Sequence, residues 1–416
     1  MTHRSAFTLI ELLVVIAVIA ILSIVVLLTL NPVQLLMQSR DGDRLSDMST
    51  LNSALGDYLA EGGTSLGSTN VVYVSIPDPT ATSSLGDQCQ GLGLPSLPAT
   101  YSYFCAPSST YRNVNGTGWI PVNFNALAAG SPFGSLPIDP VNQSSSRLYY
   151  TYDTNGTNYE VTSVMESSKY QLGGSSDVIG TDGGTLSSVY EKGSQLGLEP
   201  LDYGDSTLVG WWNFSEGTGT VAYDYSGNNA TGSWSGNATG TNGHYSPGKI
   251  GPWAGAFDGS TDQINVGNPA SLNGFTSFTI SEWINANNSL ATVASINRRS
   301  GSNGLGLNFG SWGACSTGKV NITEGGNTGL CGNTTLSLNT WYYIAAVMNG
   351  SNVTIYVNGQ PDASGTDSWT WTTGNNIFIG DEAGVTHVFP GLIDDVRIYN
   401  RALTATQIQA MYAGGK

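Results

Sequence analysis

The chain has 416 residues, enough for two or three domains, and a formal net charge of −16. This acidity argues against nucleic acid as a partner, because phosphate binding needs clustered Lys and Arg. Only 11% of the residues are charged, whereas 54 are Gly and 20 are Tyr, and this composition predicts a β-rich chain with many turns.

The N-terminus joins a short polar leader to a long apolar run. Residues 7–30 contain a single charge, at Glu11, and a helix of this length spans a bilayer. His3 and Arg4 make the leader basic, so the leader is expected to stay in the cytoplasm while the rest of the chain crosses. Glu11 is unusual there, because a charge in hydrocarbon costs about 2.5–3.5 kcal/mol.

Ala6 and the following "FTLIELLVVIAVIAILS" resemble the prepilin class III signal of type IV pilins and type II secretion pseudopilins. The resemblance implies that a prepilin peptidase cuts between Ala6 and Phe7 and then N-methylates Phe7. The family usually has Gly where this chain has Ala6. The resemblance also implies an assembly role for Glu11. Its carboxylate would pair with the Phe7 amine of a neighbouring subunit, so that neither charge is buried alone. A plain signal anchor is the alternative.

A second helix and a small sheet are expected next. Pro32 should kink or restart the helix. An amphipathic stripe follows at steps of three and four and ends at a glycine stop near residues 61–63: Leu45, Met48, Leu51, Leu55 and Leu59. Strands are predicted at residues 71–76, 100–106, 147–153 and 158–166. Residues 171–206, rich in Gly, Ser and Asp, are interpreted as a linker in which 189–193 can hold one strand or turn.

The four cysteines form two local pairs, each 16 residues apart: Cys89 with Cys105, and Cys315 with Cys331. No CxxC or Cys/His cluster suggests zinc. Two local disulfides are therefore expected, which places the chain outside the cytoplasm; four buried free thiols are the alternative.

From residue 207 onward, short strands with recurrent turn signals predict a sandwich or jelly roll. Strands are expected at 207–217, 277–286, 341–349, 352–359, 376–381 and 391–400, with a hairpin at 255–267 and a closing helix at 404–412. The segments "WWNFSEGTGTVAYDYSGN", "WYYIAAVMNGSNVTIYVNG" and "GLIDDVRIYNRALTATQI" resemble laminin-G-like, concanavalin-type jelly rolls. The resemblance covers about 205–416. It implies binding of glycans or protein surfaces, often with structural calcium, and some relatives on this fold are glycosidases.

Two kinds of ligand-binding side chain are candidates. The expected cofactor is a structural Ca²⁺, which prefers oxygen ligands from loops, although each acid also suits a turn or edge position. Asp139 belongs to an L-P-x-D-P segment that resembles the calcium loop of major pseudopilins, but the usual Trp-Gly after it is replaced by Val141 and Asn142. The further candidate ligands are Asp224, Asp258, Asp262, Asp394 and Asp395. The candidate sugar-stacking residues, each with a core role as the alternative, are Trp312, Trp369 and Trp371.

Catalysis is not expected. Retaining glycosidases need two carboxylates about 5 Å apart, and alternate residues of a strand would supply them. Asp394 and Asp395 are adjacent and so should point to opposite faces, while Glu282 stands alone. No Ser-His-Asp or metal-histidine set is visible.

The predicted fold is an α+β pilin-like part, with a long N-terminal helix and a small antiparallel sheet, followed by an all-β jelly-roll sandwich. The predicted divisions are a leader (1–6), a transmembrane and assembly helix (7–30), an amphipathic helix and head (31–170), a linker (171–206) and the jelly roll (207–416). We expect a single-pass protein of the cytoplasmic membrane with its C-terminus outside, which then enters an extracellular or periplasmic filament.

The functional hypothesis is a filament subunit, assembled with its own copies or other pilins, whose lectin-like domain binds glycans or cell-surface proteins. One alternative is a type II secretion pseudopilin whose added domain engages cargo or envelope components. The other is a pilin-anchored glycan hydrolase.

Overall fold

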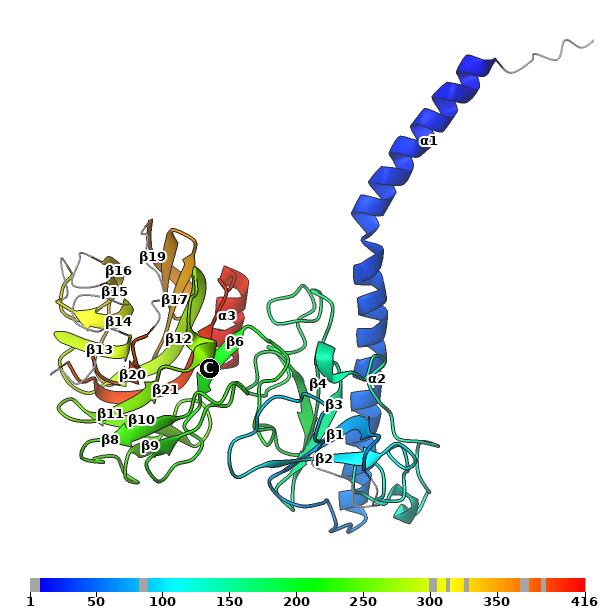
Figure 1. Cartoon of the computed structure of the whole chain (residues 1–416), viewed down its shortest axis with the longest axis horizontal. Coiled ribbons are helices and arrows are strands. Elements are labelled where there is room, and N and C mark those ends of the chain that lie inside the picture. The colour runs from blue at the N-terminus through cyan, green and yellow to red at the C-terminus, as the bar shows by residue number, and fades with distance from the viewer. Residues whose placement is uncertain are drawn as a thin grey trace, which may run out of the picture.

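Two consecutive helices open the chain, whose computed structural model describes residues 8–81, 89–298, 305–311, 315–324, 329–366, 374–382 and 387–415. They are α1 (Leu9–Leu30) and α2 (Pro32–Ala60). Asn31 lies between them in the left-handed conformation, with φ 38°. Pro32 occupies the first turn of α2, where its missing N–H has no partner to lose. The predicted restart of the helix at Pro32 is therefore confirmed, and Figure 1 shows α1 inclined to α2.

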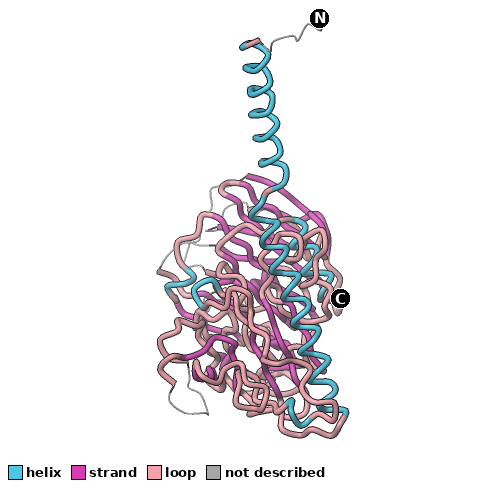
Figure 2. Tube along the Cα trace, turned by 90° about the vertical axis from the view of Figure 1, so that its right-hand side faces the viewer, coloured by secondary structure: helices cyan, strands magenta, loops and turns pink. Residues whose placement is uncertain are grey.

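The first helix stands clear of the folded body, as Figure 2 shows from a second direction. Its described side chains, from Leu9 to Leu22, are exposed and mostly aliphatic. Within the part of the chain that the structure describes, no helix combines the length and apolar character needed to cross a membrane.

The second helix packs against a five-stranded sheet, and together they form what we call the head (residues 32–206). The sheet has the order β2-β1-β3-β4-β5. Its strands are β1 (Val71–Asp78), β2 (Ser102–Pro107), β3 (Tyr150–Thr154), β4 (Tyr159–Ser163) and β5 (Tyr190–Gly193). Met48, Leu51 and Leu55 of α2 share one buried cluster with Tyr150 and Tyr152 of β3. The predicted apolar stripe thus faces the sheet.

One pair in this sheet departs from the antiparallel arrangement that the sequence predicts. Strands β1 and β2 run parallel, with Val74 opposite Cys105, while the other pairs are antiparallel. A parallel pair needs a crossover of a dozen or more residues, and the long connection between Asp78 and Ser102 supplies it. The Cys89–Cys105 disulfide ties that connection to β2, as predicted.

Residues 171–206, expected to be a linker, are packed in the structure. Strand β5 pairs with β4 and completes the head sheet. Val189, Leu201 and Tyr203 are nearly inaccessible to solvent. A few apolar residues spaced among Gly and Ser are enough to fix the segment. The linker prediction missed them because it relied on the overall composition of the segment.

Residues 207–415 form two face-to-face β-sheets, which we call the sandwich. Among the described residues, the first sheet has the order β19-β18-β17-β12-β21-β10-β9, with β6 also paired to β21. The second has the order β16-β15-β14-β13-β20-β11-β8-β7. The first sheet contains β6 (Leu208–Trp212), β9 (Tyr245–Pro247), β10 (Trp253–Asp258), β12 (Ser277–Ala286), β17 (Tyr342–Asn349), β18 (Asn352–Val357), β19 (Gln360–Thr366) and β21 (Pro390–Tyr399). The second contains β7 (Val221–Ala222), β8 (Gly232–Ser235), β11 (Gln263–Gly267), β13 (Thr292–Asn297), β14 (Leu305–Gly310), β15 (Lys319–Glu324), β16 (Leu330–Thr335) and β20 (Ile377–Ile379).

The hairpin predicted at residues 255–267 is wrong. Its two strands exist, but β10 lies in the first sheet and β11 in the second. The Asp258 carboxylate accepts hydrogen bonds from the amides of Ser260, Thr261 and Asp262 and so shapes a connection between sheets. A two-residue turn would instead have paired the strands with each other.

The outer face of the first sheet is covered by a helix and by the head. Helix α3 (Ala405–Gly414) begins with a capping box between Thr404 and Gln407. Its Ile408 joins a buried cluster that also contains Trp283 of β12 and Tyr203 of the head. The head and the sandwich therefore share one apolar cluster, and Figure 1 shows them side by side.

Candidate functional site

The start of α1 is built by Thr8 and Glu11. The Glu11 Oε2 atom accepts hydrogen bonds from the amide and the hydroxyl of Thr8, both at 2.8 Å. The Thr8 hydroxyl in turn accepts the Glu11 amide at 3.3 Å. This reciprocal capping box satisfies two amides that the helix itself leaves free. The Glu11 Oε1 atom has no partner among the described residues and stays exposed for a further contact. Ala6 and Phe7, the predicted cleavage pair, lie outside the described residues.

A buried charge network fastens α2 to the head. The Arg44 guanidinium contacts Asp139 at 2.6 Å, Asp41 at 2.8 Å and Glu166 at 2.7 Å, and the Arg44, Asp41 and Asp139 side chains are fully buried. Burial opposes the charged forms, but the arginine contacts outweigh it and lower the pKa of Glu166. Arg40 adds a more exposed contact to Glu166 at 2.6 Å. Asp139 therefore anchors α2, a role that the sequence analysis did not assign to it.

The other predicted calcium ligands accept hydrogen bonds from N–H groups. The amides of Trp211, Ser226 and Ala230 donate to Asp224, and the Asn237 amide donates to Asp262. Calcium needs six to eight oxygens around it, and no group of three or more acidic, His or Cys side chains suited to a metal occurs among the described residues. Calcium binding by these aspartates therefore stays a prediction.

Asp394 and Asp395 of β21 take different partners, as expected for neighbours on a strand. Asp394 accepts the amides of Lys249 and Ile250 at 2.7 and 2.9 Å. Asp395 accepts the Trp211 indole N–H at 2.7 Å and the Arg397 Nε–H at 3.0 Å. Their roles are therefore internal to the fold.

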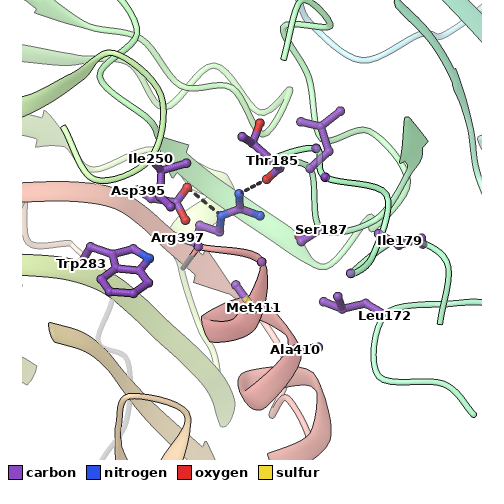
Figure 3. A pocket seen from close by; sticks show the side chains of 16 residues that line it. Leu172, Ile179, Thr185, Ser187, Ile250, Trp283, Asp395, Arg397, Ala410 and Met411 are labelled. Atoms are coloured by element: carbon purple, nitrogen blue, oxygen red, sulfur yellow. Dashed lines mark hydrogen bonds and ion pairs between the residues drawn. The ribbon is translucent and has the colours of Figure 1, made fainter. Parts of the chain in front are cut away.

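Arg397 lies at the contact between the sandwich and the head, in the view of Figure 3. It pairs with Asp395 of its own strand at 3.0 Å and with Asp202 of the head at 3.2 Å. It also donates to the Thr185 carbonyl at 2.8 Å, and its guanidinium stacks 4.5 Å from the Trp211 ring centre. The small cavity beside it, about 60 Å³, has room for little more than water.

The three tryptophans predicted to stack on sugars, Trp312, Trp369 and Trp371, lie outside the described residues. Their role stays a prediction. The Cys315–Cys331 disulfide is present as predicted.

Glu282 was considered above as a candidate catalytic carboxylate. It is fully buried, and its carboxylate accepts a hydrogen bond from the Ser295 hydroxyl. Burial raises the pKa of Glu282 to about 8, against the opposing effect of that hydrogen bond. A side chain enclosed in this way does not reach a substrate, and it is paired with a hydroxyl rather than with a second acid.

The sequence analysis missed a group of four neighbouring buried acids in the head. Asp153 of β3 and Glu160 of β4 are cross-strand neighbours, and the buried Glu191 and Glu199 lie beside them. Burial and the Glu199 charge hold the pKa of Asp153 well above its usual range. Burial and the Glu160 charge likewise raise the pKa of Glu191 well above its usual range. The cross-strand pairing of Asp153 and Glu160 was the available signal, once the register of the two strands was known.

The analysis also missed an open groove at the contact between head and sandwich. It measures about 440 Å³ and lies between the head, where the residues just before β1 and β2 and residues 197–200 line it, and residues 213–225 of the sandwich. Tyrosines, asparagines and two glutamates line it. No motif marks it, because its lining comes from four separate segments, at residues 70, 100–101, 197–200 and 213–225.

Comparisons with known proteins match both ends of the chain. Residues 1–27 match the prokaryotic N-terminal methylation motif. Residues 258–409 match the concanavalin A-like lectin/glucanases superfamily. No curated protein matches the sequence.

Solved structures similar to the chain include three from bacteria. Domain 4 of the extracellular arabinanase AbnA of Geobacillus stearothermophilus, in complex with arabinotriose, is 20% identical with a TM-score of 0.40, over 49% of this chain and 98% of that one. The binding domain of Paraclostridial Mosquitocidal Protein 1 is 18% identical with a TM-score of 0.40, over 50% and 52%. A putative carbohydrate binding protein of Bacteroides ovatus is 22% identical with a TM-score of 0.32, over 38% and 46%. TM-scores this low do not bear on function.

Proposed function

We propose that this chain, which carries a prokaryotic N-terminal methylation motif at residues 1–27 and a concanavalin A-like domain at residues 258–409, is a prepilin-type filament subunit that displays a glycan-binding sandwich. In this proposal the helix assembles, the head spaces the subunits, and the sandwich makes the contact with a surface. The finer assignments to a type IV pilus and to adhesion are part of the same proposal.

The observation that carries it is the placement of α1 relative to the sandwich. Helix α1, whose described aliphatic side chains are exposed, projects from one side of the head, and the sandwich lies on another side, as the ribbon in Figure 1 shows. A helix with no partner of its own is suited to bury its surface against copies of itself, because apolar area removed from water is the main favourable term in association. The sandwich stays clear of that contact.

Glu11 supplies register in such an assembly. Its Oε2 atom is used by Thr8, and its exposed Oε1 atom can accept a hydrogen bond from the Phe7 amine of a neighbouring subunit after cleavage at Ala6. A pair of opposite charges is tolerated in an apolar bundle where either charge alone is not. We propose that the membrane holds the subunit by this same segment before assembly.

The sandwich is proposed to bind without catalysing. The family description covers both lectins and glucanases, so the family alone does not separate the two activities. The internal roles of Glu282, Asp394 and Asp395 favour binding, because each is engaged inside the fold.

The experiment is a glycan array probed with the full-length protein in detergent, followed by a reducing-sugar assay on every glycan that is bound. Binding without release of reducing ends supports the proposal, and turnover of a bound glycan would replace it with the hydrolase. Location is tested by shearing cells and blotting the filaments. Co-purification with secretion components, and absence from sheared filaments, would favour the pseudopilin instead.

A further inference from the structure

The groove between head and sandwich has two walls that the fold holds rigidly. On the head side, Ser102 donates its amide to the Asn70 carbonyl at 3.1 Å, which fixes the starts of β1 and β2 together. On the sandwich side, the Tyr223 amide donates to Glu216 Oε1 at 2.7 Å and fixes the β6–β7 connection. The walls meet over the shared buried cluster, which includes Tyr225. The groove is therefore preformed, and its volume of about 440 Å³ lies in the range of small-molecule sites.

Its side chains present both flat apolar surface and unused polar groups. Tyr101 and Tyr223 are half-buried, with part of each ring packed against the shared cluster. The side-chain amide of Asn70 and the Nδ2 atom of Asn213 make no hydrogen bond to any described residue. Tyrosine rings have an apolar body with a polar tip. This combination matches a ligand that has apolar faces and many hydroxyl groups.

The charges of the groove narrow the ligand class. No Lys, Arg or His is among the described residues that line it, so nothing there compensates an anionic ligand. Burial raises the pKa of Glu216 to about 7, and that of Glu199 also to about 7. Two carboxyls kept partly protonated near neutral pH are poor fixed charges for a cation, and both are engaged inside the fold, Glu199 by the Thr151 hydroxyl and Glu216 by the Tyr223 amide.

We infer that this groove binds a neutral oligosaccharide, with Tyr101 and Tyr223 against the sugar faces and with Asn70 and Asn213 bonded to its hydroxyls. The inference rests on the proposed glycan-binding function and names the site for it. It also gives the head a share in recognition, since Tyr101 and Asn70 belong to the head and not to the sandwich.

The test uses the full-length protein in detergent and isothermal titration calorimetry. The ligand is the neutral oligosaccharide bound best on an array of gluco-, galacto-, manno- and arabino-oligosaccharides, with sialyllactose as the acidic comparison and trilysine as the cationic one. Thr218 is exposed on the groove rim, so Thr218→Trp fills the groove without touching the core. Its control is Thr340→Trp, at an exposed threonine outside the groove.

Two further variants probe the walls. Tyr101→Ala removes a ring from the head side, and Tyr223→Ala removes one from the sandwich side. Tyr342→Ala, at another half-buried tyrosine of the sandwich, is their control. We expect at least a tenfold loss of affinity for the three groove variants and less than a twofold change for the two controls, with melting temperatures recorded for all five.

The outcomes separate this inference from the proposed function. If Thr218→Trp, a variant of a surface residue, binds the neutral sugar as well as the wild type does, the groove is not the binding site. Glycan binding by the sandwich would then still stand. Groove-dependent binding of sialyllactose or trilysine, but of no neutral sugar, overturns the ligand class. If the wild-type protein binds no glycan at all, the proposed function fails and the inference falls with it.

Discussion

Arg44 sits where a leucine would be expected, on the buried stripe of α2. Asp41, Arg44, Met48, Leu51 and Leu55 follow one another at steps of three and four, and all five are buried. The ion pairs with Asp41 and Asp139 are thus enclosed between the helix and the sheet. Such a network specifies one docking position for the helix, since any shift in register would leave charges unpaired.

Replacing Arg44 by Met is expected to destabilise the head by about 3–5 kcal/mol, because Asp41 and Asp139 would remain buried without their cation. The measurement is urea unfolding of the full-length protein in detergent, followed by tryptophan fluorescence. Arg40→Met is the matched control. Its pair with Glu166 is partly exposed, and removing it should cost about 0–1 kcal/mol. Equal losses in the two variants would contradict the anchoring role of Arg44.

Glu282 should make stability fall as the pH rises. Its pKa is about 8 when folded and about 4.3 when unfolded, so between these values only the unfolded chain releases the proton. Stability contributed by this group is complete below about pH 4, and it declines by up to about 1.4 kcal/mol per pH unit until the pH passes the folded value. Glu282→Gln removes the titration and should flatten the profile.

The measurement is the melting temperature at pH 5 and at pH 8. Burial raises the pKa of Asp182, Glu199 and Glu216 to about 7 each, so these groups also lower the stability as the pH rises. The quantity to compare is therefore the difference in melting temperature between the variant and the wild type. We expect that difference to favour Glu282→Gln at pH 8 and to shrink at pH 5. Glu61→Gln, at an exposed position, should show no such change. A Glu282→Gln profile parallel to that of the wild type would refute the assignment.

Individual residues were predictable from the sequence where their partners are local. Both disulfides follow from pairs 16 residues apart. Partners that are distant along the chain were not predictable, and Asp139 shows why. Its place before Pro140 fits a turn or a metal loop equally well, whereas the partner that decides its role, Arg44, is 95 residues away. The stripe of α2 did hold a clue, because Asp41 and Arg44 fall in phase with its leucines.

Elements with strong periodicity or capping signals were predicted closely. The structure places β12 at Ser277–Ala286, as expected, and ends α2 at Ala60, next to the predicted glycine stop. Strands β14, β15 and β16 were missed. Their sequences, "LGLNFG", "KVNITE" and "LCGNTT", are short and rich in Gly, Asn and Thr, so pairing with neighbouring strands defines them more than their own propensity does.

Helix α1 offers a test of what Glu11 does beyond capping. Glu11→Ala should leave insertion and cleavage after Ala6 unharmed, because it removes a charge from an apolar segment. Filaments should be abolished or sharply reduced, because the Phe7 amine of a neighbour loses its partner. Fractionation and shearing, with mass spectrometry of the N-terminus, measure all three properties.

Thr8→Ala is the matched variant at the same helix end. It removes the cap, which is worth about 1 kcal/mol, but leaves the Glu11 carboxylate in place. We expect near-normal filament yield from Thr8→Ala. An equal loss of filament yield in Thr8→Ala and Glu11→Ala would mean that assembly needs the cap rather than pairing between subunits. A normal filament yield from Glu11→Ala would exclude both roles for Glu11.

At the scale of the whole molecule, the head and the sandwich are joined as one body. They share a buried cluster, and two arginines of the sandwich bind acids of the head: Arg397 binds Asp202 at 3.2 Å and Arg401 binds Asp205 at 2.8 Å. Tyr399 adds a hydroxyl contact to Ser187 at 2.9 Å. In the proposed filament, a sandwich held in this way would transmit force from a bound ligand directly to the head and α2, whereas a loosely tethered one would first have to extend its linker.

This joint predicts a single cooperative unfolding transition for head and sandwich, which differential scanning calorimetry of the full-length protein would show. Arg397→Met leaves Asp202 and Asp395 without their shared cation in a buried site, at a cost of about 3 kcal/mol. Because that cost falls on the contact between the two parts, the transition should split in two, and proteolysis within residues 171–206 should accelerate. Arg401→Met removes a pair that is about one-third exposed on the arginine side and should leave one transition. Two transitions in the wild-type protein, or one transition that merely shifts in Arg397→Met, would show that the buried pairs do not couple the head to the sandwich.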